Sequence, residues 1–324
     1  MKKTAVFANL GNGLKLGILT FVVFGIYLKL GKEPLLKSHL YSQWNFFFSS
    51  QQWLKLFLLL VLIPVNWSLE AIKWQRLVRN IEYLTFHQAL KGVLSGLTIR
   101  MAIPFGLGEI TGRIWQLEAL ERKSALGALM VSRFTQTLAT FLFGTIGFNL
   151  YIFNHFPDLF HKAFWVVVPA FCALIFFILH IVLKKGSEKL ITIARFKFLS
   201  PYVDRYSQFD SKAVFEAFLF SSLRYLVFAI QFMWVLTMME VDLQPAILFA
   251  GVTFVYLVKS LLPAFNFLSD LGIREFSALY FFSFYQVDLA SVLLASLILW
   301  FFNIMIPSLV GVFYVFKMKI FNSP

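Results

Sequence analysis

The sequence predicts an all-α integral membrane protein, with about six full spans and two re-entrant helical hairpins in an inverted-topology repeat. Of its 324 residues, 59% are hydrophobic and 19% aromatic, and only 14% are charged. Soluble globular proteins have roughly 45–50% apolar and about 25% charged residues. Polar surface would run out before this apolar excess could be buried in one water-soluble core. The composition therefore argues against a soluble enzyme, a disordered chain and a coiled coil.

The spans follow from the length that a bilayer requires. A hydrocarbon core of about 30 Å needs roughly 20 apolar residues of helix. The stretches that meet this requirement are residues 14–30, 53–72, 125–152, 162–183, 213–239 and 288–316. The first stretch lacks a small-residue cleavage site, so we interpret it as a retained anchor and not as a signal peptide. The whole chain, residues 1–324, is predicted to be one membrane domain.

Lysine and arginine are concentrated in alternate loops between these spans. The residues concerned are Lys2, Lys3, Lys15, Lys73, Arg76, Arg79, Arg122, Lys123, those of the basic loop at residues 184–212, Lys317 and Lys319. The positive-inside rule then predicts that both termini are cytoplasmic, and it accounts for most of the net charge of +13. No soluble domain gathers this charge, so nucleic acid is not a predicted partner. The basic loop is either a segment on the anionic inner leaflet or a solvated connector.

The apolar stretch at residues 86–118 is interrupted near its centre. Residues 104–109 read Pro-Phe-Gly-Leu-Gly-Glu. Proline removes a backbone donor and glycine permits turn geometry, so a continuous helix is not expected here. Basic residues flank both ends of the stretch, which predicts that it enters the membrane from the cytoplasm and returns to it.

A second interrupted stretch, residues 245–286, contains Pro263 and a short polar break at residues 269–275. Acidic residues flank it, so we expect it to enter from outside. Span, hairpin and span thus occur twice, at residues 53–152 and 213–316, with opposite orientation. Interrupted helices at matching places of an inverted repeat predict a transport site near the bilayer midplane. Long spanning helices kinked at the prolines are the alternative.

Several short motifs occur in a fixed order along the chain. They are Asn66-Trp67, Trp74 to Arg76, the break at residues 104–109, Ser132-Arg133 within residues 125–147, Leu262-Pro263, and the Gly-Ile-Arg-Glu run at residues 272–275. At these distances they resemble the membrane domain of lysylphosphatidylglycerol synthases and their stand-alone flippase-like relatives. The resemblance implies translocation of a phospholipid or a lipid-linked headgroup between leaflets, in the plasma (inner) membrane of a prokaryote.

The chain also departs from the pattern of that family. Where the family often has an acidic residue before the arginine and an aspartate after it, this chain has Ser132 and Gln136 on either side of Arg133. No soluble domain follows Phe321, so aminoacyl transfer from tRNA is not expected, and we expect that the chain is not an enzyme.

Ionisable residues in apolar segments need a structural or functional reason. Glu109 and Arg113 are four residues apart and share a helix face, whereas Arg274 and Glu275 point about 100° apart and are not expected to pair with each other. We hypothesise that a lipid phosphate visits the helix starts after Gly108 and Gly272. The predicted substrate-binding residues are Gly106, Gly108, Glu109, Arg113, Asp270, Gly272, Arg274 and Glu275, with supporting, structural roles for Arg133 and Arg224.

In this hypothesis the arginines contact the phosphate, and the acidic residues contact a cationic headgroup, bind a coupling proton or hold the arginines. The alternative is that these charges only neutralise one another and hold the hairpins in place. Glu70 and Glu216 are predicted to lie at the membrane interface because they are near span ends. Tryptophans near the proposed boundaries are predicted to anchor the chain there. These are Trp44, Trp53, Trp67, Trp74 and Trp165.

No cofactor or metal site is predicted. The five histidines have no metal-ligand spacing, and the single Cys172 lies in an apolar run. The leading hypothesis is a lipid-translocating protein whose partners are membrane lipids. The second is a non-catalytic subunit that recruits or regulates a lipid- or glycan-modifying enzyme, and the third is a membrane-embedded transferase.

Overall fold

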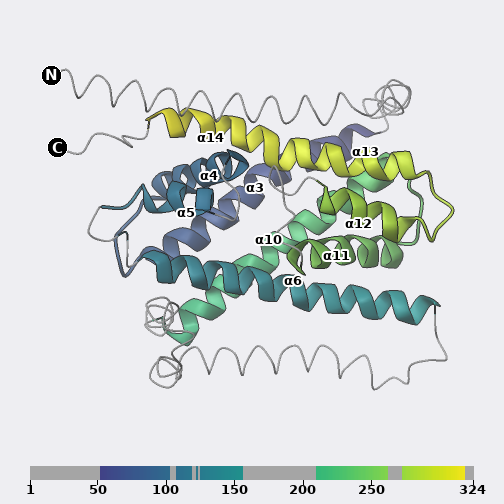
Figure 1. Cartoon of the computed structure of the whole chain (residues 1–324), viewed down its shortest axis with the longest axis horizontal. Helices are drawn as coiled ribbons and strands as arrows, with labels where there is room; N and C mark the ends of the chain where they lie inside the picture. Colours follow the sequence, from purple (N-terminus) through teal and green to yellow (C-terminus); the bar gives the residue numbers. More distant parts are fainter. Residues whose placement is uncertain are drawn as a thin grey trace.

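The computed structural model describes residues 52–102, 107–118, 122, 125–155, 209–261 and 272–317. The predicted spans at residues 14–30 and 162–183, most of the basic loop, and the candidate residues Gly106 and Asp270 lie outside the described residues. The described part is helical and contains no strand (Figure 1). Its elements are α3 (Trp53–Val78), α4 (Phe86–Ala102), α5 (Leu107–Ile114), α6 (Ala125–His155), α10 (Ser211–Met238), α11 (Pro245–Leu261), α12 (Ile273–Phe282), α13 (Leu289–Trp300), the π-helical segment η5 (Phe301–Met305) and α14 (Ile306–Lys317).

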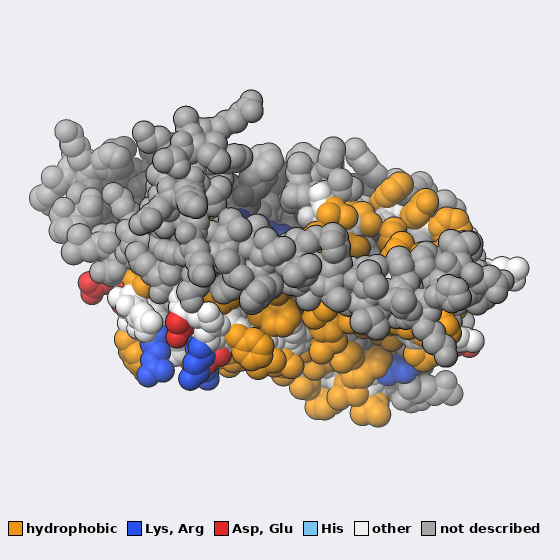
Figure 2. Space-filling view, turned by 90° about the horizontal axis from the view of Figure 1, so that it is seen from below, with side chains coloured by type: hydrophobic (Ala, Val, Ile, Leu, Met, Phe, Trp, Pro, Cys, Tyr) orange, Lys and Arg blue, Asp and Glu red, His pale blue; other side chains and the backbone are white. Residues whose placement is uncertain are grey.

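Four of these helices are long and apolar enough to cross a membrane. They are α3, α6, α10 and the continuous helix Leu289–Lys317, which joins α13, η5 and α14. Where Figure 2 draws described side chains, hydrophobic ones cover the lower centre and the right of the face, and most of the charged ones gather at its lower left. The prediction of an all-helical integral membrane protein is confirmed at this level, whereas the number of six spans stays a prediction.

The long helix α3 extends further than its hydropathy predicts. It continues to Val78, so Lys73 and Arg76 are part of the helix and not of a flanking loop. The helix passes Pro64, which has no N–H to donate to the preceding turn. Close to this proline, Gln231 Nε2 of α10 donates a hydrogen bond of 3.2 Å to the carbonyl oxygen of Leu59. The carbonyl that Pro64 leaves without a helical donor is that of Leu60, so this bond attaches α10 to α3 beside the proline without replacing the missing donor.

Helices α4 and α5 form an antiparallel hairpin. Their glycines face each other at backbone distance: a Cβ at Gly112 would overlap the backbone of Gly96, and one at Gly108 would overlap Arg100. Further along the hairpin, a Cβ at Gly92 would lie 3.2 Å from Gln116 Cγ. Residues later in α5 thus contact residues earlier in α4, which is the pattern of a chain that turns back. The first interrupted stretch is therefore not one kinked helix.

Helices α11 and α12 form a second hairpin of the same kind. A Cβ at Gly251 of α11 would lie within 3 Å of the rings of Phe281 and Phe282 in α12. Three residues further along α11, Phe254 stacks on Tyr280 with ring centroids 6.3 Å apart. The direction of pairing is again antiparallel. Both interrupted stretches thus return on themselves, although their orientation relative to a bilayer stays a prediction.

The two halves pack reciprocally (Figure 1). In the first half, Gly144 and Gly147 let α6 pack against α11, where a Cβ would meet Leu257 and Thr253. In the second half, Gly311 lets α14 pack against α4 in the same way. The corresponding helices α3 and α10 pack against each other. The last long helix of each half therefore contacts the first hairpin helix of the other half.

A π-helical segment interrupts the last long helix where it passes α3. Pro307 has no N–H, so the carbonyl of Asn303, four residues earlier, loses its helical donor. Trp67 Nε1 of α3 donates to this carbonyl instead, at 3.1 Å. π-helical turns are often found at functional sites, and this turn lies beside the residues of the candidate site described next.

Candidate functional site

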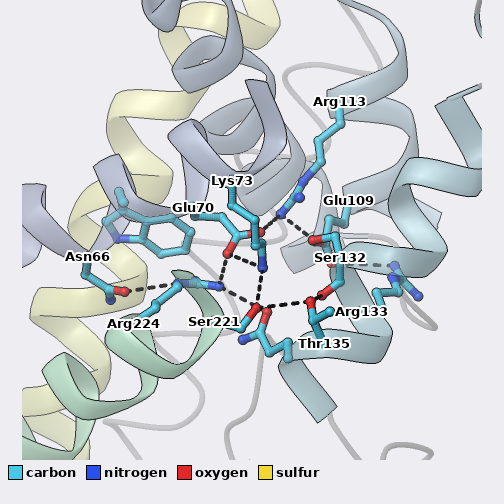
Figure 3. A network of polar contacts seen from close by, with 12 residues as sticks. Asn66, Glu70, Lys73, Glu109, Arg113, Ser132, Arg133, Thr135, Ser221 and Arg224 are labelled. Carbon is cyan, nitrogen blue, oxygen red and sulfur yellow. Dashed lines mark hydrogen bonds and ion pairs between the residues drawn. The ribbon is translucent and has the colours of Figure 1, made fainter. Parts of the chain in front are cut away.

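Four helices contribute polar side chains to one buried network, which we call the Glu70 cluster (Figure 3). Its members are Asn66, Glu70 and Lys73 of α3, Glu109 and Arg113 of α5, Arg133, Thr135 and Gln136 of α6, and Ser221 and Arg224 of α10. Positions 66, 70 and 73 are one turn apart and share one face of α3. That face is directed into the bundle, which makes the cluster a contact between helices from both halves of the chain.

Glu70 is the centre of the cluster. Its side chain is 1% exposed, and both of its oxygens bind cations. Oε1 lies 2.7 Å from Arg113 Nη2, and Oε2 lies 2.7 Å from Arg224 Nη1 and 2.9 Å from Lys73 Nζ. A buried charge is tolerated only when it is paired and hydrogen-bonded. Glu70 therefore joins α3, α5 and α10 through its ion pairs.

The guanidinium of Arg224 has hydrogen-bond partners along its edge and aromatic rings against its faces. Its Nε donates to Asn66 Oδ1 at 3.0 Å, and its Nη1 also reaches Gln136 Oε1 at 3.2 Å. The guanidinium lies over the ring of Trp67 at 4.9 Å and over that of Phe228 at 5.4 Å. Such stacking stabilises a cation that has left water. The predicted structural role of Arg224 agrees with this set of contacts.

Arg113 and Glu109 connect the hairpin to the rest of the cluster. Arg113 Nη2 lies 2.6 Å from Glu109 Oε1 and also binds Glu70, as described above. The predicted sharing of one helix face by Glu109 and Arg113 is therefore confirmed. Glu109 Oε2 in turn lies 3.5 Å from Arg133 Nη2. Arg133 thus obtains a carboxylate partner from α5, whereas its neighbours on α6 are Ser132 and Gln136.

A chain of hydroxyl groups completes the cluster below Lys73. Lys73 Nζ donates to Ser221 Oγ at 3.2 Å, and this oxygen lies 3.2 Å from Thr135 Oγ1. Lys73 is 1% exposed, although it is part of a basic run in the sequence. Among the described residues, the lysine ammonium contacts Glu70 of α3 and Ser221 of α10, and its side chain is buried.

A second and smaller polar group fixes the start of α12. Arg274 Nη2 lies 2.7 Å from Glu275 Oε1, and Arg274 also donates to Ser296 of α13 through Nε at 2.9 Å. Glu275 Oε2 accepts a hydrogen bond of 2.6 Å from the N–H of Gly272, which is the half of a capping box that a glycine N-cap can form. Gly272 has a φ of 108°, which suits glycine. The expectation that Arg274 and Glu275 do not pair is therefore wrong.

The long guanidinium of Arg274 explains this correction. It bends across the first turn of α12 because Ser296 supplies both Oγ and its carbonyl oxygen, the latter at 2.8 Å from Nη2. Neighbouring positions point in different directions from the helix axis, but side chains of this length can still meet. Arg274 and Glu275 are both buried and neutralise each other.

The family of the chain follows from its sequence. It matches the lysylphosphatidylglycerol synthase TM region over residues 14–311, which is nearly the whole chain. The chain belongs to this family. No curated protein and no solved structure matches it. Membership confirms the resemblance that the motifs indicated, and it points to a lipid-related function in a membrane.

Within this family member, some predicted positions need correction. Glu70 was predicted to lie at the interface, yet it is buried at the centre of the cluster. Trp67 and Trp74 were predicted to be interfacial anchors, but both are buried, under Arg224 and Arg113 respectively. Trp53 is exposed near the start of α3, whereas Trp44 and Trp165 lie outside the described residues.

The other candidate residues of this family member have structural contacts outside the Glu70 cluster. Gly108 serves the close contact of α5 with α4, and Gly272 caps α12. Glu216, also predicted to lie at the interface, is partly exposed and pairs with Arg76 at 3.0 Å. In the part of the chain that the structure describes, no group of His, Cys, Asp and Glu could hold a metal ion.

Proposed function

We propose that this protein moves a phospholipid or a lipid-linked headgroup between the two leaflets, and that the Glu70 cluster is where the headgroup passes. One observation carries the proposal: a protein of a lipid-related membrane family places six connected charged side chains among four helices. Insertion scales assign about 2.5–3.5 kcal/mol to each such residue at the centre of a spanning helix. Charged residues within membrane-spanning segments often mark substrate pathways, and in this proposal the lipid is moved without a chemical step.

The arrangement of helices supports a transport role in a second way. Two hairpins, each between long helices, and the reciprocal packing of α6 on α11 and of α14 on α4 are what an inverted-topology repeat would give. In transporters with such repeats, the substrate site lies where the repeats meet. The Glu70 cluster joins α3, α5 and α6 of the first half to α10 of the second. We place both termini in the cytoplasm and the protein in a prokaryotic inner membrane as part of this proposal.

The test is reconstitution into liposomes with a fluorescent phospholipid, scored for exchange between leaflets. Arg113→Gln removes a buried cation of the cluster, and we expect the protein-dependent exchange rate to fall by about tenfold or more, which is about 1.4 kcal/mol in activation free energy. Arg76→Gln is the matched control, because Arg76 is an exposed arginine with a single carboxylate partner at 3.0 Å. Equal loss in both variants, or no loss in Arg113→Gln, would reject the cluster as the route.

The same preparation tests the second hypothesis, that of a non-catalytic subunit for a lipid- or glycan-modifying enzyme. Such a subunit would leave the exchange rate at that of protein-free liposomes, whatever residue occupies position 113. Exchange by the purified wild-type chain would reject it.

A further inference from the structure

The Glu70 cluster holds more positive than negative charge. Its two carboxylates, Glu70 and Glu109, are outnumbered by their ion-pair partners. These partners are Lys73, Arg113, Arg224 and, at the edge of the cluster, Arg133. Excess buried charge of one sign is unfavourable unless a counter-ion compensates it. Among the described residues, the three buried cations Lys73, Arg113 and Arg224 share the two carboxylates, and an anion would compensate the difference.

Arg113 has the donors that such an anion would use. Its side chain is 3% exposed, and a single nitrogen, Nη2, makes both of its carboxylate contacts. Its Nε and Nη1 are buried and have no hydrogen-bond partner. Among the arginines that the structure describes, no other has a buried nitrogen without a hydrogen-bond partner. Guanidinium N–H groups match the geometry of phosphate oxygens.

Each oxygen of the two carboxylates, in contrast, already contacts a cation. Both oxygens of Glu70 bind buried cations, and the oxygens of Glu109 bind Arg113 and Arg133. A cationic headgroup entering the cluster would have to displace one of these partners. It would also add to an existing excess of positive charge.

The polar residues at the start of α12 differ from the Glu70 cluster in their charge balance and in the hydrogen bonding of their arginine. Arg274 and Glu275 are one cation and one carboxylate, and Ser296 takes the remaining contacts of Arg274. No nitrogen of Arg274 is buried without a partner. Among the described residues, both hairpins pair their helices in antiparallel fashion, and the arginine with buried, unpartnered nitrogens belongs to the first hairpin.

The anion has an approach from the edge of the cluster. Arg133 is 42% exposed and Glu109 is 20% exposed, whereas Arg113, which contacts Glu109, is 3% exposed. In Figure 3, Arg133 lies on the side of Glu109 that is opposite Glu70. An anion that first contacts Arg133 would therefore be separated from Arg113 by Glu109, which contacts both arginines.

We infer that the Glu70 cluster binds one phosphoryl anion at Arg113, and that the protein prefers headgroups with a phosphate and no positive charge. This inference rests on the proposed function for the lipid as the source of the anion. A soluble phosphate would be recognised by the same chemistry. Zwitterionic and cationic headgroups are disfavoured because no free carboxylate is present for their amine.

Binding tests this without reference to transport. Purified protein in uncharged detergent is unfolded by heat with added inorganic phosphate, phosphatidylglycerol, phosphatidylcholine or lysylphosphatidylglycerol. We expect phosphatidylglycerol to raise the midpoint by about 2–4 °C more than either of the other lipids. A rise with inorganic phosphate as well would identify the phosphoryl group itself as sufficient, and a rise with the lipid alone would identify the lipid as the source.

Two variants decide whether Arg113 is responsible. Arg113→Lys keeps the positive charge but lacks the Nε and Nη1 donors, so we expect it to lose the preference. Arg76→Lys is the same change at an exposed site and should keep it. A preference that survives in Arg113→Lys would overturn the inference, and so would equal shifts with all three lipids in the wild type. The wild-type comparison decides the matter even if Arg113→Lys does not fold. Selective binding without leaflet exchange would reject only the proposed function.

Discussion

Arg113 and Arg224 bind opposite oxygens of the Glu70 carboxylate, each at 2.7 Å. Arg113 comes from a short hairpin helix and Arg224 from a long helix of the other half, so one buried carboxylate joins the two halves of the chain. Through Arg113, Glu70 thus connects α5 to α10, in addition to the packing of α5 against α4. This relationship also explains why four helices can carry charged residues through an apolar environment.

Glu70→Gln keeps the shape of the side chain and removes its charge. The buried cations Lys73, Arg113 and Arg224 would then lack their shared carboxylate. Removing one partner from a buried ion pair typically costs about 3–5 kcal/mol. We expect a loss of this size in the free energy of unfolding, measured by denaturant titration in detergent. Glu216→Gln, at the surface pair with Arg76, should cost less than about 1 kcal/mol. Similar losses in the two variants would contradict the central position of Glu70.

Trp67→Phe tests the hydrogen bond at the π-helical segment. Phenylalanine keeps an aromatic face under Arg224 but donates nothing to the Asn303 carbonyl, which Pro307 already deprives of its helical donor. An unsatisfied buried carbonyl costs about 1–3 kcal/mol. We expect this loss of stability and faster amide exchange in residues 301–306, measured by mass spectrometry. Trp53→Phe, at an exposed position, is the control, and unchanged exchange in Trp67→Phe would count against the interpretation.

Glycines of the first hairpin should tolerate alanine to different degrees. A Cβ at Gly112 would overlap the backbone of Gly96, whereas at Gly92 it would lie 3.2 Å from a flexible glutamine side chain. Overpacking of this kind costs typically about 1–3 kcal/mol. We expect Gly112→Ala to lower the free energy of unfolding by that amount and Gly92→Ala to be close to neutral. Thermal unfolding of both variants checks the order, and equal effects would mean that α4 and α5 are not in backbone contact.

Ser296→Ala separates structure from transport. The change removes a hydroxyl that binds Arg274 and Glu275 in the second hairpin, and it should cost about 1–2 kcal/mol of stability. Because this polar group is neutral and self-contained, we expect the rate of leaflet exchange to stay within about twofold of the wild type. Ser283→Ala, at an exposed serine, is the control for stability. A stable Ser296→Ala protein that has lost exchange would assign the second hairpin a direct role.

The interruption of both hairpins could be predicted from sequence because its causes are local. Pro104 and Gly106 in the first stretch, and Pro263 and Gly272 in the second, predict a break whatever surrounds them, and the described helices α4 and α11 end at Ala102 and Leu261. The helices on either side of each break then pack together, as the glycines of α4 and α5 and Gly251 of α11 show. Composition likewise predicts the membrane class without knowledge of contacts.

The centre of the candidate site could not be predicted, because it depends on partners far away in the sequence. Hydropathy ends the second span before Lys73, so Glu70 reads as a residue near a membrane boundary. In the folded chain, Arg113 and Arg224 neutralise Glu70, and α3 continues to Val78. The spacing of Asn66, Glu70 and Lys73 on one helix face was the signal that could have indicated a buried polar stripe.

A headgroup cross-linking experiment tests the central claim most directly. Phosphatidylglycerol with a photoactivatable group on its headgroup is incorporated into liposomes with the purified protein, illuminated, and the adducts are located by mass spectrometry. The account predicts adducts in α5 and α6 around Glu109, Arg113 and Arg133, and their loss when unlabelled phosphatidylglycerol is added in excess. Adducts confined to other parts of the chain, with none in α5 or α6, would contradict it.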